Sequence, residues 1–398
     1  MAPASVAANE PQPLEAAACL ERARALTALI EASAAEGEAR RALMPDVVEA
    51  LVEADLYRML VPRLFGGAEL PPSRFVEVIE CVAAADGSTA WCLCQSCGCS
   101  MSAAFLAPDV AREIFGTPNG ILAWGAAGPG ISAAHCEGGY RLTGEWPFVS
   151  GGHQARWIGA QQVPVLGADG APEVSDHGKP VMRTFLFPKA ATRVTDVWHV
   201  IGLRGTASDT FSVSDLFVPE EHSYEFGGAP QSLHGGALYR FPINSIYSIG
   251  FAGVALGLAR RLFDRFIELA RAKTPRLTSA ALRDSQVVQS QAAQAQAKLG
   301  AARLYLLRSL AEIEAVAGAA GSLTLEQQMS IRLAASFATL QAREVADFAY
   351  HAAGSTAVFD SSPFERAFRD LHTVTQQVQA RQAHFETVGR YLLGGRPA

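Results

Sequence analysis

Three long helical stretches in the C-terminal half of the chain most restrict what it can fold into. They run from Ser245 to about Ala272, from Asp284 to about Val316 and from Leu325 to about Ala353. At a rise of 1.5 Å per residue, each stretch predicts a helix about 42–50 Å long. Thr324 and Gln327 form a capping-box pattern at the start of the third. A fourth helical stretch, open to interruption, runs from Pro363 to Leu393. Long helices with short connections predict an antiparallel four-helix bundle.

The middle of the chain has a different pattern. From Ile121 to about Val218, short runs rich in Gly, Pro, Thr, Val and Trp end at turn residues, as in MRTFLFP and DTFSVSDLFVP. Runs of this length and spacing predict the strands of an antiparallel sandwich or barrel rather than a parallel sheet.

The first region is helical again. Apolar residues near helical spacing, separated by turn residues, predict five helices at 14–34, 46–57, 75–85, from 89 onward and at 109–115. The predicted fold class is α+β, mostly α. Its predicted parts are a disordered tail at 1–12, an N-terminal α-helical domain at 13–118, a middle β domain at 119–230 and a C-terminal four-helix bundle at 231–398.

Composition excludes several classes of partner. The net charge of −6 and pI near 5.9 do not attract a phosphate backbone, so we expect no nucleic acid partner. No stretch approaches the roughly 20 apolar residues of a membrane helix, so we expect no membrane partner. The N-terminus lacks a basic region followed by an apolar run, so we expect no signal peptide. We therefore expect a cytoplasmic protein whose seven cysteines are reduced.

Four of the cysteines form a tight C-x-C-x-x-C-x-C cluster, at Cys92, Cys94, Cys97 and Cys99. Thiolates at such spacings can bind zinc or an iron–sulfur cluster. The surrounding segment TAWCLCQSCGCSMSAAFL is apolar, however, and predicts one continuous helix. At about 100° per residue the four thiols fan out around such a helix, so we interpret them as packing residues, with a metal site as the alternative. A redox C-x-x-C pair is disfavoured because no strand leads into it.

Four strings, in chain order, resemble the acyl-CoA dehydrogenase superfamily. They are GEWPFVSGGHQARW at 144–157, GLRGTASDTFSVSDLFV at 202–218, HAAGSTAVFDSSPFERAFRD at 351–370 and GRYLLG at 389–394. The last is similar to the tail of the group D two-component flavin-dependent monooxygenases. That branch includes hydroxyphenylacetate and secosteroid hydroxylases and dibenzothiophene monooxygenase. The resemblance covers nearly the whole chain and implies the same order of helical, β and four-helix regions.

The resemblance also implies a flavin site. Phe148 matches a residue that covers the flavin ring, with Val149 and Gly151 in the same turn, and Trp124 and Gly125 match the other flavin-edge strand. Gln286, Gly354 and Ser355 match positions that approach the diphosphate or adenine side of the cofactor from a neighbouring subunit. Ser355 replaces the family's second Gly, and the R-x-x-F-G pattern is poorly matched at 272–276, so FADH2 and FMNH2 both stay open, with O2 as co-substrate.

Ser150 matches the position whose hydroxyl or backbone reaches flavin N5 and C4a. A small hydrogen-bond donor there could steady a C4a-hydroperoxide. The plainer interpretation is a Ser that closes a turn before two glycines.

The expected catalytic bases are replaced. The two places that supply the Glu of a dehydrogenase hold Val378 and Tyr247, which argues against a dehydrogenase. The His of the monooxygenase branch is replaced by Gln377, which can hydrogen-bond an oxygen but cannot take a proton. The substitute candidates are His372 and His384, although we favour the interpretation of His372 as a surface or interhelical residue near Asp370. Substrates that need no base, such as a sulfide, an amine or an activated thioester, become more plausible.

The resemblance therefore implies a reduced-flavin-dependent monooxygenase that acts through a flavin C4a-hydroperoxide on a small aromatic or heteroatom-containing substrate. It implies a separate flavin reductase and a homotetramer built as a dimer of dimers. One alternative is an atypical acyl-CoA dehydrogenase or oxidase with a displaced base. The other is a flavin-binding or structural paralogue without activity.

If Gln377 faces the flavin, the variant Gln377→His should gain hydroxylation of a phenol, because an imidazole can take the phenolic proton. Product formation with a separate flavin reductase measures this, with Gln382→His as the matched control. An inert Gln377→His variant would indicate that the pocket differs elsewhere.

Overall fold

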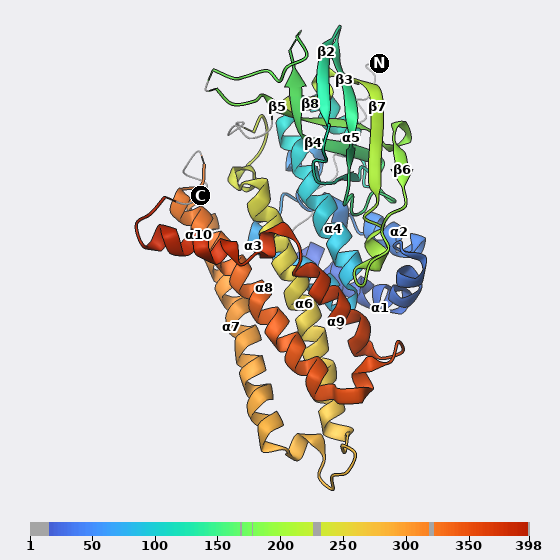
Figure 1. The fold of residues 1–398 in the computed structure, drawn as a ribbon, viewed down its shortest axis with the longest axis vertical. Helices are drawn as coiled ribbons and strands as arrows, with labels where there is room; N and C mark the ends of the chain where they lie inside the picture. The colour runs from blue at the N-terminus through green and yellow to red at the C-terminus, as the bar shows by residue number, and fades with distance from the viewer. Residues whose placement is uncertain (1–15, 168, 177, 226–231, 318–321, 397–398) are drawn as a thin grey trace, which may run out of the picture.

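The computed structural model describes residues 16–167, 169–176, 178–225, 232–317 and 322–396. The predicted tail at 1–12 lies outside these residues. Figure 1 shows the strands gathered at one end of the long axis and the long helices extending to the other end, with the first helices beside them. This order of helices, strands and helices confirms the predicted fold class, while the predicted domain boundaries stay a prediction.

Five α-helices form the N-terminal region: α1 (Ala16–Arg40), α2 (Pro45–Glu53), α3 (Pro72–Ala85), α4 (Gly87–Ser100) and α5 (Pro108–Phe115). A proline opens α2, α3 and α5, where its fixed φ suits the first helical turn. The prediction of one helix over 46–57 was wrong, because Asp55 adopts a left-handed φ of 59° and the chain continues in a 3-10 turn, Leu56–Arg58.

Eight strands form one mixed sheet. They are β1 (Leu122–Trp124), β2 (Ser132–Cys136), β3 (Gly139–Trp146), β4 (Trp157–Leu166), β5 (Met182–Pro188), β6 (Arg193–Thr195), β7 (Thr210–Pro219) and β8 (Ser223–Glu225). The strand order is β6-β7-β3-β2-β4-β5-β8, with β1 paired to β4. The prediction of a purely antiparallel arrangement was wrong for two pairs, because β4 runs parallel to both β1 and β2. The long connections that lead into β4 from both strands permit this direction.

Five α-helices follow: α6 (Ile243–Ala272), α7 (Gln286–Ala317), α8 (Leu325–Ala353), α9 (Pro363–Val374) and α10 (Ala383–Leu392). The capping box at Thr324 and Gln327 is confirmed by both of its reciprocal hydrogen bonds. The fourth predicted stretch is interrupted by a 3-10 turn at Val378–Ala380, which separates α9 from α10.

Helix α6 is the centre of the bundle and packs against α3, α4, α8 and α9. It is long and apolar enough to cross a membrane by length and composition, but 83% of its most apolar window is buried inside the fold, as in a core helix. Small residues let its neighbours approach closely. A Cβ on Gly257 would lie 2.4 Å from the backbone oxygen of Glu80 on α3.

Helix α4 joins the bundle to the sheet, because it contacts α6 and α9 on one side and β1 on the other. Its four cysteine side chains fan out, as predicted, toward different neighbours. Cys92 Sγ lies 3.7 Å from Thr206 O, Cys97 Sγ lies 3.3 Å from Leu56 O, and Cys99 Sγ lies 3.5 Å from Tyr247 Oη. Cys94 meets α6 at Gly250. All four are free, buried thiols, and burial raises the pKa of Cys92 and of Cys99 to about 12.

Two glycine substitutions should change stability in opposite directions. Gly257→Ala should destabilise the fold by about 1–3 kcal/mol, because its Cβ would push against the α3 backbone. Gly300→Ala should stabilise it by up to about 1 kcal/mol, because nothing lies within 4 Å of the added Cβ on α7 and Ala favours helix. Urea unfolding at one protein concentration measures both. Equal effects of the two substitutions would contradict the close α3–α6 contact.

Candidate functional site

A turn after β3 presents the central residues of the predicted flavin site. Phe148 adopts a left-handed φ of 61° and leaves its ring 60% exposed, while Val149 and Ser150 point into the protein. Gly151 follows with a φ of 77°, a conformation that favours glycine. Two backbone hydrogen bonds hold the turn against residues 206–209. Val149 N donates to Asp209 O at 3.1 Å, and Gly151 N donates to Thr206 O at 3.2 Å.

The end of β1 lies directly against this turn. A Cβ on Gly125 would lie 2.1 Å from Pro147 O, so only a glycine permits the close approach. Ala126 N donates to the same Pro147 O at 3.0 Å, and Gln95 Nε2 of α4 donates to Trp124 O at 3.2 Å. The structure therefore brings the predicted residues Trp124 and Gly125 together with the turn at 148–151.

A second loop, at 202–208, supports the turn from inside. Leu203 and Ala207 both adopt left-handed backbone conformations, with φ of 53° and 44°. Asp370 of α9 holds the loop in place by accepting a hydrogen bond from Leu203 N at 2.6 Å. The carbonyl of Leu203 accepts from Trp198 Nε1 at 2.9 Å and from Thr206 Oγ1 at 2.8 Å. The C-terminal helix α9 thus sets the position of a loop that borders the turn.

A chain of side-chain hydrogen bonds connects the turn to this loop. Trp91 Nε1 donates to Ser150 Oγ at 2.9 Å. Ser150 Oγ lies 2.6 Å from Ser208 Oγ, which in turn lies 2.7 Å from Thr206 Oγ1. We name these four residues, Trp91, Ser150, Ser208 and Thr206, the hydroxyl relay. Its three hydroxyl residues are each at most 5% exposed.

Sequence reasoning missed three members of the relay. Thr206 and Ser208 lie in the string GLRGTASDTFSVSDLFV at 202–218, in which hydroxyl residues two apart follow Arg204, and this was the signal that could have pointed to them. Trp91 carries no signal of its own, because it lies in the cysteine-rich helix and reaches the turn only through the fold.

Aromatic side chains extend from the relay along α6. The Trp91 and Phe251 rings are stacked, with centroids 3.9 Å apart and planes at 15°. The Phe251 and Tyr247 rings follow, 5.7 Å apart and at 11°. We name these three residues the aromatic wall. Burial raises the pKa of Tyr247 well above its ordinary value, so its hydroxyl stays protonated.

His372 and Gln377 make hydrogen bonds that lead away from the turn. His372 Nε2 lies 2.8 Å from Asp347 Oδ1 on α8, and its ring packs on Phe368. This agrees with the interhelical interpretation, although the partner is Asp347 rather than Asp370. Gln377 Oε1 accepts from Gln379 N at 2.7 Å and so caps the short turn after α9. Among the described residues the structure joins neither side chain to Ser150, and their catalytic roles stay predictions.

The remaining predicted cofactor residues gather at the far end of the bundle. Gln286 begins α7, and Gly354 and Ser355 follow α8; all three are exposed. Lys273, just after α6, joins this end by donating to Ala353 O at 2.6 Å and to Thr356 Oγ1 at 2.8 Å. Figure 1 shows this end of α6, α7 and α8 pointing away from the sheet. No hydrogen bond among the described residues joins these residues to the turn at 148–151.

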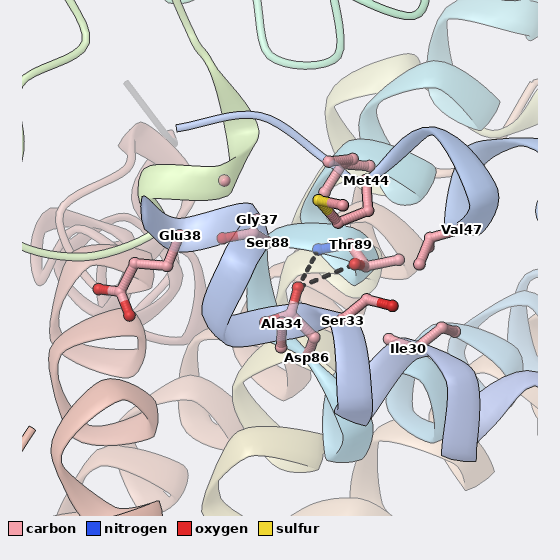
Figure 2. Close-up of a pocket in the computed structure, with 12 residues that line it drawn as sticks. Ile30, Ser33, Ala34, Gly37, Glu38, Met44, Val47, Asp86, Ser88 and Thr89 are labelled. Carbon is pink, nitrogen blue, oxygen red and sulfur yellow. Dashed lines mark hydrogen bonds between the residues drawn. The ribbon is translucent and has the colours of Figure 1, made fainter. Parts of the chain in front are cut away.

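A small pocket opens on the other side of the loop at 202–208, between α1 and the start of α4 (Figure 2). Figure 2 shows the Asp86 carboxylate bonded to both the backbone N and the hydroxyl of Thr89, each at 2.8 Å. Asp86 is thus the N-cap of α4. None of the site residues predicted from the sequence lines this pocket, so we assign it no ligand.

Asp370 is a buried acid beside the site whose pKa is raised. It is 3% exposed, and burial raises its pKa to about 7, with the nearby charges of Asp86 and Glu38 acting in the same direction. The hydrogen bond from Leu203 N and the charge of Arg366 oppose this rise. Asp370 therefore changes protonation near neutral pH at the point where α9 holds the loop.

Comparisons with known proteins agree with this fold. Residues 249–382 match the family model described as Acyl-CoA dehydrogenase, C-terminal domain. Indole-3-acetate monooxygenase of Pseudomonas putida is 29% identical over 91% of this chain and 90% of its own length. The oxygenase subunit HsaA of a flavin-dependent monooxygenase from Rhodococcus jostii is 27% identical over 89% of this chain and 92% of its own. The crystal structure of 3-HSA hydroxylase from Rhodococcus sp. RHA1 matches with a TM-score of 0.86 at 25% identity, covering 96% of this chain and 97% of that one.

Fold and relatives together confirm the class predicted from the sequence, a flavin-dependent monooxygenase with the acyl-CoA dehydrogenase fold. Within that class the chain is similar to the oxygenase subunits of two-component systems.

The variant Asp370→Asn should flatten the pH dependence of stability. Because the pKa of Asp370 is raised in the folded state, its contribution to the free energy of unfolding is fully present below about pH 4. That contribution is lost as the pH rises through about 7. The amide still accepts a hydrogen bond from Leu203 N but does not titrate. Between pH 4 and 8 the free energy of unfolding should fall less in Asp370→Asn than in the parent protein. The difference should be about a few kcal/mol, as expected from the size of the pKa shift. Urea unfolding across this range measures it, with the exposed Asp360→Asn as the control. Parallel pH profiles for the parent and Asp370→Asn would refute the assignment.

Proposed function

We propose that this chain is the oxygenase component of a two-component monooxygenase, which uses a reduced flavin from a separate reductase to oxygenate a small aromatic substrate. One observation carries the proposal. Ser150 is held between an exposed aromatic face at Phe148 and the aromatic wall that begins at Trp91.

The residues at this turn fit a flavin ring. Phe148 is a large aromatic side chain left mostly exposed on a strained backbone, which suits a flat partner stacked against it. Gly125 keeps the neighbouring strand edge free of a side chain. Ser150 supplies a polar atom at the boundary of the two surfaces, so Phe148, Ser150 and the Trp124–Gly125 edge would hold the ring.

When bound, a reduced flavin would supply two electrons to dioxygen, from which one oxygen atom goes to the substrate and the other to water. The chain's own residues would bind the flavin and orient the substrate. Tyr247 and Phe251 are buried, so a planar substrate would meet the aromatic wall at the half-buried Trp91, next to Ser150. Tyr247, at one of the two positions for a dehydrogenase base, is a buried phenol with a raised pKa and cannot abstract a proton near neutral pH. The other position holds Val378, so the residues disfavour dehydrogenase chemistry.

Gln377, at the position that the resemblance gives to a His, favours an electron-rich ring. Gln377 cannot deprotonate a phenol, whereas an indole ring is nucleophilic without losing a proton. Indole-3-acetate, named for the Pseudomonas putida relative, is therefore the first compound to test. A sulfide or amine would meet the same requirement and forms the second group of candidates.

The exposed residues Gln286, Gly354 and Ser355 support a shared site. They lie at the start of α7 and just after α8, at the end of the bundle that points away from the sheet, so we infer that they reach a cofactor in a neighbouring subunit. We infer a homotetramer, a dimer of dimers, in which each long flavin tail is held by a partner's bundle. Both FAD and FMN remain candidates, and a cytoplasmic location fits a reductase-dependent enzyme.

Isotope labelling tests the proposed activity directly. The purified protein is combined with a flavin reductase, NADH, FAD or FMN, and indole-3-acetate under 18O2. One 18O atom in the product supports the function. Hydrogen peroxide as the only product with every compound tried would contradict it. Reduction of bound flavin by an acyl-CoA without oxygen would favour a dehydrogenase instead.

Removing the Ser150 hydroxyl should uncouple oxygen use from product formation. In Ser150→Ala the fraction of oxygen released as hydrogen peroxide should rise about tenfold, as expected for the loss of one hydrogen bond at the reacting centre. Peroxide and product are measured together in the coupled reaction. Ser336→Ala is the control, because it removes another buried hydroxyl, on α8, that has no hydrogen-bond partner among the described residues. Unchanged uncoupling in Ser150→Ala would remove Ser150 from the site.

A further inference from the structure

The hydroxyl relay has a direction that its two ends determine. At one end, the indole nitrogen of Trp91 can only donate, so Ser150 Oγ accepts this hydrogen bond. At the other end, the Leu203 carbonyl can only accept, so Thr206 Oγ1 donates its single proton there, at 2.8 Å.

The protons between the two ends follow from this. Thr206 has already used its proton, so Ser208 must donate to Thr206 across 2.7 Å. Ser208 has then used its own proton, so Ser150 must donate to Ser208 across 2.6 Å. Every donor in the relay therefore points from Trp91 toward Leu203. Reversal would leave two oxygens, Thr206 Oγ1 and Leu203 O, facing each other at 2.8 Å without a proton between them.

This direction leaves Ser150 with one free lone pair and no free proton. We propose that the hydroxyl relay makes Ser150 an acceptor toward the cofactor, and that Trp91, Ser208 and Thr206 are positioning residues for it. This replaces the sequence-based hypothesis of Ser150 as a donor. The inference rests on the proposed function, namely that a flavin lies against this turn.

An acceptor at this place distinguishes the two redox states of a flavin. The N5 atom of a reduced flavin carries a hydrogen and can donate, whereas N5 of an oxidised flavin is only an acceptor. Ser150, held as an acceptor, can accept a hydrogen bond from N5 of the reduced ring. Against the oxidised ring, a lone pair of Ser150 Oγ would face the lone pair of N5, which is unfavourable. The relay therefore selects the reduced cofactor and favours release of the oxidised one.

The loop keeps the relay in this state. Leu203 O stays in place because Asp370 holds the amide of the same residue and Trp198 Nε1 also donates to the carbonyl. The relay hydroxyls are buried, so water competes little for their protons. A variant that breaks the relay at Thr206 or Ser208 should free the Ser150 proton, while a variant at Trp91 should not.

Flavin binding tests the relay without turnover. Dissociation constants of FMN and of reduced FMN, and of FAD and reduced FAD, are measured anaerobically by ultrafiltration. We expect the parent protein to bind the reduced form more tightly. In Thr206→Val and in Ser208→Ala the ratio of oxidised to reduced dissociation constants should fall about tenfold, the effect of one hydrogen bond gained or lost.

Three further variants separate the relay from a general loss of structure. Thr206→Ser keeps the hydroxyl and should restore the parent ratio. Thr339→Val removes another buried hydroxyl, which donates to a carbonyl of α8, and should leave the ratio unchanged. Trp91→Phe removes the donor to Ser150 but leaves the Ser208–Thr206–Leu203 end intact, so it should keep the preference for reduced flavin.

The outcomes are distinct. Equal ratios in the parent, Thr206→Val and Ser208→Ala, all folded by circular dichroism, would overturn the relay while leaving the flavin site in place. A lost preference in Trp91→Phe but not in Thr206→Val would overturn the direction assigned here. A folded parent protein that binds neither flavin in either redox state would overturn the proposed function, and the relay's role with it.

Discussion

The structure around the site depends on how the backbone of Leu203 is held. Its amide donates to Asp370 of α9, and its carbonyl accepts from Trp198 and Thr206. A non-glycine residue in a left-handed conformation persists only where its surroundings over-determine it, and these hydrogen bonds do so. Through them the bundle, the loop at 202–208 and the turn at 148–151 share one geometry, although they are far apart in the chain. The buried acid and the strained loop therefore act as one unit.

Local patterns predicted much of this fold, and non-local pairings account for what was missed. The long helices follow from periodicity and length, and the capping box at Thr324 follows from two side chains three residues apart. The end of α2 was missed because Asp55 turns the chain with a single left-handed residue that propensity does not reveal. The parallel direction of β4 was missed because strand partners are chosen by packing across the sheet.

The site shows the same division. The turn at Phe148 and Ser150 could be found from a short string because its residues are contiguous. The role of Ser150 could not, since the partners of its hydroxyl are Trp91, 59 residues earlier, and Ser208, 58 residues later. The partner of His372 was likewise hidden, because Asp347 lies on another helix. The sequence predicted which turn forms the site, whereas the direction of the hydroxyl hydrogen bonds could be inferred only from the fold.

Burial of the cysteines on α4 affects how readily they are oxidised. A chain that handles dioxygen beside reduced cofactor is exposed to the hydrogen peroxide that leaks from it, and Cys92 follows Trp91 directly on α4. Peroxide oxidises the thiolate rather than the thiol. With its pKa raised by burial from 9.0 to about 12, the Cys92 thiol holds about a thousandfold less thiolate at neutral pH than an unperturbed cysteine. Burial alone thus lowers the reactivity of Cys92, and all seven cysteines are free thiols without a disulfide.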